Sequence, residues 1–210
     1  MNAIRILITG FGPFPGAPFN PTQALVRRLA VLRRPALADV TRIAHVFPVS
    51  YSAVDRELPQ LLAEHRPDAL LMFGLAARTP FIRVESRARN AVTQLWPDAE
   101  HTSVRRAAIV RGTEAQPFGP HSATLLRAAR RHGLDVRASR DAGRYLCNYL
   151  SWRGIEATRA PQGPALAAFV HVPLVAHDTA SHRMTMPQLV AAGEALLRET
   201  VRLARARRTR

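Results

Sequence analysis

Short apolar runs alternate with longer amphipathic stretches along most of the chain. Three of these runs are AIRILIT (residues 3–9), ALLMFGL (69–75) and ALAAFVHVPL (165–174). Continuous apolar runs of this length are typical of strands buried on both faces of a sheet. Strands of this kind that alternate with helices favour an α/β fold. Because 210 residues suffice for one core and no linker or repeat divides them, we predict a single domain over residues 1–210.

Helix start signals follow several of these runs. Asn20 suits the N-cap of a helix and Pro21 its first position, which predicts a helix over NPTQALVRRLAVL. The second helix is expected to open at Ser52, with Asp55 three residues later offering a partial capping arrangement. The sequence TMPQ (185–188) supplies a T-x-x-Q capping box for the last helix. These signals place helices between the predicted strands, as an α/β fold requires.

The chain is strongly basic, with a formal net charge of +15. All 30 basic residues are arginine, and they are scattered apart from one concentration in the terminal VRLARARRTR. No zinc-finger spacing, RNP-like aromatic motif or basic heptad region accompanies them. We therefore expect no dedicated binding of nucleic acid, although a basic binding module stays open as an alternative.

The distribution of apolar residues and cysteine bears on the compartment. No apolar run approaches the ~20 residues that span a bilayer. The N-terminal MNAIRILITGFGPF is apolar over too few residues for the core of a signal peptide. One cysteine cannot form an internal disulfide, so nothing indicates an oxidising compartment. We expect a cytoplasmic protein that has no membrane partner.

The first strand leads into GFGPFPG, which nearly matches a dinucleotide-binding fingerprint. Pro15 stands where the third glycine would fall, and Pro13 removes another backbone N–H. Pyrophosphate binding needs these donors free at a helix N-terminus, so we expect no phosphate-bearing cofactor. Phe11 and Phe14 remain in a rigid loop, where they either line a small apolar pocket or plug the sheet edge.

The histidines do not predict a metal site. None of the eight lies in an H-E-x-x-H motif or at a Cys/His ligand spacing. His177 and His182, near Asp178, come closest, and a solvated loop explains them better. His171 is different, because it interrupts an apolar run near a strand end, where α/β enzymes place functional groups. We expect no bound metal.

An acid and a thiol complete the candidate groups. FIRVESRA alternates as a half-buried strand should, and Glu85 in it is either a surface ion-pair partner of its neighbouring arginines or a functional acid. Cys147 in DAGRYLCNYLSW is either a small core residue or a nucleophile at the head of a helix. Together with His171 these are the groups of a thiol acyl-transfer site. The residues alone do not bring them together in space.

Four segments resemble the pyroglutamyl peptidase I (pyrrolidone-carboxylate peptidase) family of cysteine peptidases. ILITGFGPFPGAPFNP is similar to the opening of the family, with T-G-F-x-P-F and then N-P. RVESRARN resembles the glutamate segment, which matches Glu85 and Asn90. DAGRYLCNYL is similar to the nucleophile segment A-G-x-x-x-C-N, which matches Cys147 and Asn148, and AFVHVP resembles the segment that carries the histidine, His171.

The resemblance implies a fold, an activity and a site. The fold would be a three-layer α/β/α domain with a twisted, mostly parallel mixed central sheet. The activity would be removal of an N-terminal 5-oxoproline from peptides with blocked N-termini, without metal or organic cofactor, by a homo-oligomer (tetramer or dimer). Cys147 would be the nucleophile, His171 the general acid and base, and Glu85 the residue that orients His171. Phe11 and Phe14 would hold the lactam ring.

Two positions depart from the family pattern. The family usually reads G-Q-A-G-G-R after the third strand, whereas this chain reads GLAART, with Leu75 in place of the glutamine. Leu95 in QLWPDA stands where the family has the arginine of A-R-I-P-D-N. If Leu75 lines the pocket, selectivity for pyroglutamate should be weaker. A thiol hydrolase of the same fold, acting on another small acyl or lactam group, and a catalytically weak basic binding module are the alternatives.

Overall fold

The computed structural model describes residues 3–14, 16–112, 114–131, 133–176 and 183–208. In this part of the chain a six-stranded sheet has the order β2-β1-β3-β8-β4-β7, in which all neighbours are parallel except β4 and β8. Its strands are β1 (Ile4–Phe11), β2 (Val40–Phe47), β3 (Ala69–Leu75), β4 (Ile82–Glu85), β7 (Val136–Ser139) and β8 (Leu166–Val172). A separate antiparallel pair joins β5 (Arg87–Arg89) to β6 (Ala115–Pro117).

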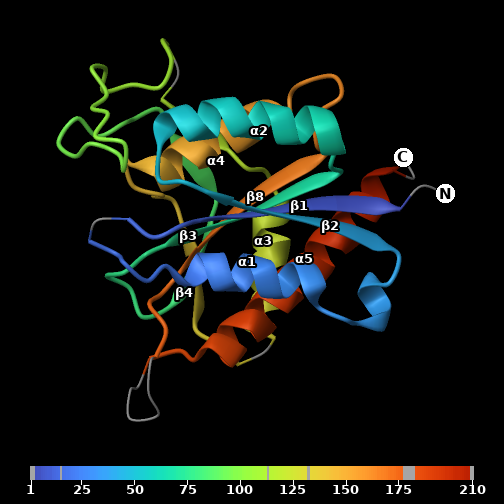
Figure 1. The fold of residues 1–210 in the computed structure, drawn as a ribbon. Helices are drawn as coiled ribbons and strands as arrows, with labels where there is room; N and C mark the ends of the chain where they lie inside the picture. Colours follow the sequence, from blue (N-terminus) through green and yellow to red (C-terminus); the bar gives the residue numbers. More distant parts are fainter. Residues whose placement is uncertain (1–2, 15, 113, 132, 177–182, 209–210) are drawn as a thin grey trace.

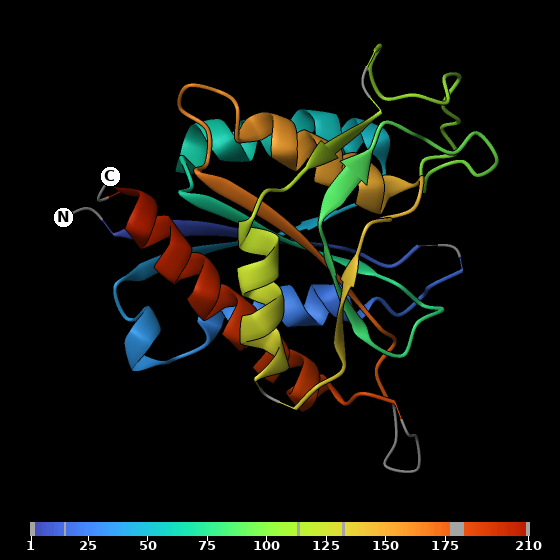
Figure 2. The same ribbon diagram turned by 180° about the vertical axis from the view of Figure 1, so that it is seen from behind.

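Helices cover both faces of the six-stranded sheet (Figures 1 and 2). On one face lie α1 (Pro21–Val31), α3 (His121–Arg130) and α5 (Met186–Arg208), and on the other lie α2 (Tyr51–His65) and α4 (Leu146–Ala157). A short 3-10 turn, η1 (Pro35–Leu37), precedes β2. The predicted α/β fold, with three layers and a mostly parallel mixed sheet, is confirmed.

Alternate side chains of each central strand pack into different layers. Leu71 and Phe73 of β3 belong to the core beneath α1, α3 and α5. Leu70 and Met72 belong to the core beneath α2 and α4, as does Phe169 of β8. Because side chains repeat every second residue along a strand, residues 74 and 171 also face α4. This face of the sheet carries the candidate site.

The predicted starts of the first and last helices are confirmed. Asn20 is the N-cap of α1, and its Oδ1 accepts a hydrogen bond of 3.1 Å from the N–H of Thr22. Pro21 occupies the first helical position. Ahead of α5, the N–H of Thr185 donates to Gln188 Oε1 at 2.9 Å and the N–H of Gln188 donates to Thr185 Oγ1 at 3.4 Å, which together form the capping box. Local sequence therefore determines both of these helix starts.

Two predictions about local structure are wrong. The second helix begins at Tyr51, because Ser50 is the N-cap and its Oγ accepts a hydrogen bond from the N–H of Ala53, so Ser52 lies inside the helix. The strand predicted for FIRVESRA divides at Ser86 into β4 and β5, which belong to different sheets. The N–H of Ser86 bonds to β7 while its carbonyl accepts from the start of the loop after β6. Because these two hydrogen bonds connect Ser86 to different segments, the chain changes direction at this residue.

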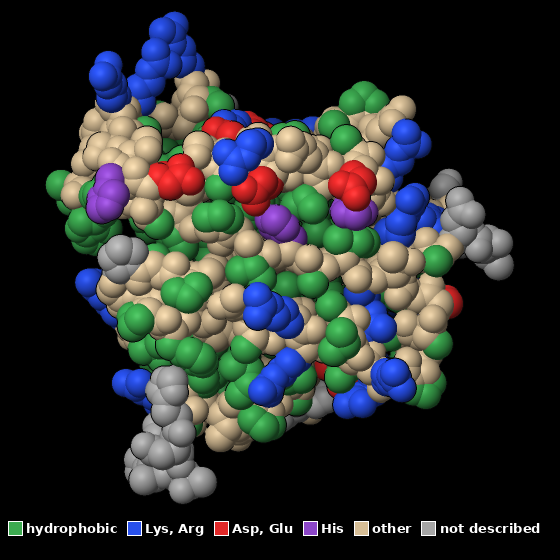
Figure 3. All heavy atoms as spheres, viewed as in Figure 1, with side chains coloured by type: hydrophobic (Ala, Val, Ile, Leu, Met, Phe, Trp, Pro, Cys, Tyr) green, Lys and Arg blue, Asp and Glu red, His purple; other side chains and the backbone are tan. Residues whose placement is uncertain are grey.

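Arginines are spread over the surface in small groups, between apolar and uncharged patches (Figure 3). In the terminal helix, Arg205 pairs with Asp39 at 2.6 Å and Arg208 pairs with Asp68 at 2.7 Å. The basic end of the chain is therefore folded back onto the sheet and partly neutralised. Within the described residues, no helix has the length and apolar character needed to cross a membrane.

We predict that duplex DNA binds this surface weakly and without sequence preference. Scattered arginines attract phosphates by charge alone, and such binding falls steeply with salt because condensed counterions are released. Fluorescence anisotropy with two unrelated duplexes should give a Kd weaker than about 1 μM at ~50 mM salt and no measurable binding at ~200 mM salt. Tight binding of one duplex at the higher salt would instead identify a nucleic-acid binding module.

Candidate active site

Cys147 is the second residue of α4, which begins at Leu146 without a side-chain cap. Its sulfur occupies space that exists because residue 74 is glycine. A Cβ added to Gly74 would lie 2.6 Å from Cys147 Sγ and 2.7 Å from the Phe169 ring, both too close for real contacts. The glycine in β3 thus allows the helix to bring its thiol down onto the sheet. Cys147 as a whole is partly exposed, so it is not simply a core residue.

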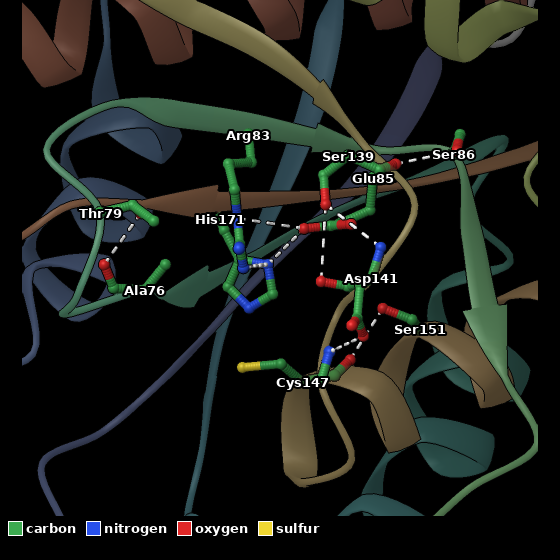
Figure 4. A network of polar contacts seen from close by, with 11 residues as sticks. Ala76, Thr79, Arg83, Glu85, Ser86, Ser139, Asp141, Cys147, Ser151 and His171 are labelled. Atoms are coloured by element: carbon green, nitrogen blue, oxygen red, sulfur yellow. Dashed lines mark hydrogen bonds and ion pairs between the residues drawn. The ribbon is translucent and has the colours of Figure 1, made fainter.

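His171 lies on β8, directly across from Gly74 on one neighbouring strand and Arg83 on the other. Its Nδ1 lies 2.8 Å from Oε1 of Glu85, and the two residues are 3% and 0% exposed. An ionised carboxylate can only accept a hydrogen bond, so Nδ1 carries the proton and Nε2 is left free. Figure 4 shows the His171 ring between Cys147 and this carboxylate. The arrangement provides a thiol, a base and a group that orients the base.

Opposing effects set the charge state of the thiol and imidazole. Burial raises the pKa of the Cys147 thiol, and the Glu85 carboxylate raises it further. Arg83 and the backbone N–H groups of Leu75 and Cys147 lower that pKa, because each favours the thiolate. Burial lowers the pKa of His171, although its hydrogen bond to Glu85 opposes this. At neutral pH the site therefore holds a protonated thiol and a neutral imidazole that can accept its proton.

Asn148 fastens the start of α4 to β5. Its Oδ1 accepts from the N–H of Arg89 at 2.8 Å, and its Nδ2 donates to the carbonyls of Arg89 and Ala91. The side chain is fully buried, and both of its polar atoms have hydrogen-bond partners in this attachment. The residue after the candidate nucleophile is thereby held against the strand that follows Glu85.

Asn90 organises the long excursion after β5. Its Oδ1 accepts from the N–H groups of Ile109 and Val110, and its Nδ2 donates to the carbonyl of Val110. An amide that pairs with three backbone groups about twenty residues away closes the base of this loop. The two asparagines that match the family motif therefore have structural roles beside the site.

The end of β1 and the loop after it bring Phe11 and Phe14 to the same apolar cluster as Cys147, and Phe11 belongs to the strand and not to the loop predicted from the sequence. Phe11 is 3% exposed and packs against Phe47, with ring centroids 6.2 Å apart. Phe14 is partly exposed at the edge of the cluster and forms a backbone bridge with Ala17. Phe11 therefore resembles a core plug, whereas the ring of Phe14 lies at the edge of the cluster and is partly exposed.

The two leucines that depart from the family pattern lie differently. Leu75 follows Gly74 on β3 and pairs with Val172, so strand alternation turns its side chain toward the layer of α1 and α5. What reaches the sulfur from Leu75 is its backbone N–H. Leu95 is 83% exposed in the long excursion.

Metal-ligating side chains do not gather elsewhere in the described residues. No group of three His, Cys, Asp or Glu side chains among them is placed to hold a metal ion. His177, Asp178 and His182 lie outside the residues that the structure describes.

Comparison with known proteins places this site in a family. The family model described as pyroglutamyl peptidase matches residues 4–203. The chain belongs to the pyroglutamyl peptidase family. It is 31% identical over 179 residues to the pyrrolidone-carboxylate peptidase of Thermococcus kodakarensis, with 84% of each protein covered. It is 29% identical over 204 residues to that of Thermococcus onnurineus, with 95% of this chain and all 100% of the relative covered.

Solved structures show the same fold. Pyrrolidone carboxyl peptidase from Thermococcus litoralis superposes with a TM-score of 0.86 at 24% identity, over 99% of this chain and 96% of that one. A Pyrococcus furiosus enzyme of the same name also reaches 0.86, at 23% identity. The resemblance recognised in the sequence, to a family of cysteine peptidases, is confirmed.

Two residues of this pyroglutamyl peptidase site carry no motif that marks them in the sequence. Gly74 makes room for the sulfur, and Nη2 of Arg83 lies 3.2 Å from His171 Nδ1. The sequence suggests Arg83 only as a surface ion-pair partner of Glu85. The antiparallel pairing of β4 with β8 turns it toward the histidine instead, and no local pattern predicts that pairing.

Proposed function

We propose that this chain is a cysteine exopeptidase that hydrolyses the amide bond after an N-terminal pyroglutamyl residue. The observation that carries the proposal is the buried Glu85–His171 pair, joined at 2.8 Å beside the strand position where Cys147 Sγ rests. Burial of a carboxylate or an imidazole costs solvation free energy unless the group has a hydrogen-bond or ion-pair partner, and here each is the partner of the other. Next to a thiol they form the orienter, base and nucleophile of acyl transfer.

The reaction follows from these three groups. His171 Nε2 accepts the proton of the Cys147 thiol as Sγ attacks the pyroglutamyl carbonyl carbon. The tetrahedral intermediate collapses, the C–N bond breaks, and His171 returns the proton to the departing amine. Water then attacks the thioester with the same imidazole as base, which releases pyroglutamate and restores the thiol. Glu85 keeps the imidazole in the required tautomer throughout.

Backbone donors near the sulfur fit the charge that develops on the carbonyl oxygen. The first N–H groups of a helix have no acceptor within that helix, and α4 has no side-chain cap to occupy them. The N–H of Cys147 lies at this uncapped end and already favours negative charge on the sulfur. We assign the start of α4 to stabilisation of the oxyanion.

The lactam ring needs an apolar surface and partners for one N–H and one carbonyl. Phe14, with Phe11 beneath it, supplies apolar surface at the end of β1. Leu75 is the C-terminal residue of β3, and its backbone, not its side chain, supplies polar groups. We also propose a cytoplasmic homo-oligomer, a dimer or tetramer, in keeping with the family resemblance; sedimentation velocity would measure its size.

Release of fluorophore from pyroglutamyl aminomethylcoumarin tests the proposal. The pure protein should hydrolyse it, and prior treatment with iodoacetamide should abolish hydrolysis, because the chain has one cysteine. Mass spectrometry of the treated protein would verify a single carbamidomethyl group. Absence of hydrolysis by a protein whose thiol alkylates readily would contradict the proposal and favour a thiol hydrolase with another small acyl substrate.

We predict that Leu75→Gln changes the preference for pyroglutamyl over prolyl substrate by less than about threefold. Strand alternation directs the side chain away from the sulfur, so we expect the absence of the glutamine to have little effect on selectivity. The measurement is the ratio of kcat/KM for the two aminomethylcoumarin substrates on both proteins. A tenfold sharper preference in the variant would place this side chain in the pocket after all.

A further inference from the structure

A guanidinium lies beside Nδ1 of the imidazole, across the ring from Nε2, which accepts and returns the proton in the proposed reaction. Nη2 of Arg83 is 3.2 Å from His171 Nδ1, and its Nε is 3.5 Å from Glu85 Oε1 (Figure 4). The Arg83 side chain is 24% exposed, so its charge is only partly screened by water. The acid–base pair of this site is therefore a cluster of three groups.

Nδ1 cannot form hydrogen bonds with both Glu85 and Arg83 in the same protonation state. Arg83 has donors and no acceptor, so Nδ1 accepts from it only when unprotonated. Glu85, when ionised, requires Nδ1 to carry a proton. The contact with Glu85 is the shorter, 2.8 Å against 3.2 Å, and selects the protonated Nδ1. Arg83 is thus held against a polarised N–H, where its positive charge disfavours a second proton on the ring.

Two carboxylates around the ring act against this effect, so the charge of Arg83 offsets part of theirs. Glu85 beside Arg83 on β4 favours the imidazolium, and so does Asp141 in the segment before α4. Asp141, however, is largely exposed and is itself paired with Arg89 of β5 at 2.9 Å. From α4 the facing group is the thiol, which is neutral until it reacts. The charge of Arg83 acts on both reacting groups, the imidazole that it contacts and the thiol.

We propose that Arg83 is a positioning residue that holds Glu85 against His171. By its charge, it also keeps the imidazole unprotonated, and lets the thiol ionise, at lower pH than Cys147, His171 and Glu85 would without it. This inference rests on the proposed roles of Cys147 and His171. It assigns to one arginine the position of the pH range in which the peptidase works.

Arg83→Gln keeps a hydrogen-bond donor and removes the charge. Without the cation the imidazolium persists to higher pH, so the acidic limb of kcat/KM moves upward. The thiolate also loses a stabilising charge, so the alkaline limb moves in the same direction. We expect both limbs to rise by about one pH unit. Arg83→Lys, which keeps a charge, should remain within about 0.3 unit of wild type, since opposite charges act over several ångströms.

Alkylation supplies a second readout that needs no substrate. The rate of iodoacetamide reaction at Cys147, followed by mass against pH, should shift upward by the same amount in Arg83→Gln. Arg87→Gln is the matched control, because Arg87 bonds to the carbonyl of Arg140 at the surface and should leave both profiles unchanged. Circular dichroism verifies folding, and Arg83→Met replaces the glutamine variant if that one does not fold.

The outcomes separate this inference from the proposed function. A folded neutral variant whose activity and alkylation profiles coincide with wild type would overturn the role of Arg83 while the peptidase stands. Lower activity with unmoved limbs would likewise reduce Arg83 to a structural residue. If wild type releases no pyroglutamate, the proposed function fails, and the alkylation profiles still decide whether Arg83 controls the thiol.

Discussion

Cys147→Ala is expected to lower kcat for pyroglutamyl aminomethylcoumarin by about 10⁵-fold or more, to the limit of detection. Without sulfur, no thioester forms, and the Glu85–His171 pair has no nucleophile to activate. The fold should persist. Cys147 is partly exposed as a residue, and loss of its sulfur enlarges the space beside Gly74, so the free energy of unfolding should fall by about 1 kcal/mol.

Steady-state rates and urea unfolding of both proteins measure these effects. Ser151→Ala is a suitable control, because its Oγ donates to the carbonyl of Cys147 from one turn along the same helix. It perturbs α4 without touching the reacting atoms and should retain most of the activity. A Cys147→Ala protein that still turns over substrate would exclude the thiol mechanism altogether.

Glu85→Gln is expected to lower kcat by about 10³- to 10⁴-fold, with little change in KM. The glutamine amide can donate to Nδ1, which moves the imidazole proton to Nε2 and removes the base. The substitution also leaves Arg83 without the carboxylate that lies 3.5 Å from its Nε. Because the Glu85 side chain is fully buried, no water can take over the hydrogen bond that its carboxylate accepts from Nδ1.

The chain offers a matched control for this substitution. Glu57 pairs at 2.9 Å with His45 of the edge strand β2, which β1 separates from β3, and both side chains are partly exposed. Glu57→Gln should cost little activity, because surface pairs contribute little and this one touches no reacting group. If Glu85→Gln kept near-normal kcat, the site would be a thiol–imidazole dyad and Glu85 only a buried ion-pair partner.

The fold was predictable wherever its causes are local. The buried strands are recognisable as apolar runs. The start of α1 is determined by two adjacent residues, Asn20 and Pro21. The start of α2 was missed because Ser50 and Ser52 suit a cap equally well by sequence. The choice depends on Asp98, whose carboxylate accepts from the N–H of Tyr51. A partner 47 residues away cannot be read from a window of sequence.

The candidate site divides in the same way. Cys147, His171 and Glu85 were identified by resemblance, and their convergence depends on the order of strands in the sheet. Gly74 and Arg83 carry no signature of their own. Each becomes part of the site because the pairing of β3, β8 and β4 places it level with His171. Register across a sheet is a property of the whole chain, so single positions do not reveal it.

The buried amide of Asn148 has a mechanical consequence. It clamps the first turn of α4 to β5, and β5 begins two residues after Glu85. The antiparallel pairing of β4 with β8 ties Glu85 in turn to the strand that carries His171. Thiol, acid and base are therefore all held by one connected set of backbone and buried side-chain contacts. We expect the spacing between imidazole and sulfur, which the transferred proton must cross, to be fixed before substrate binds.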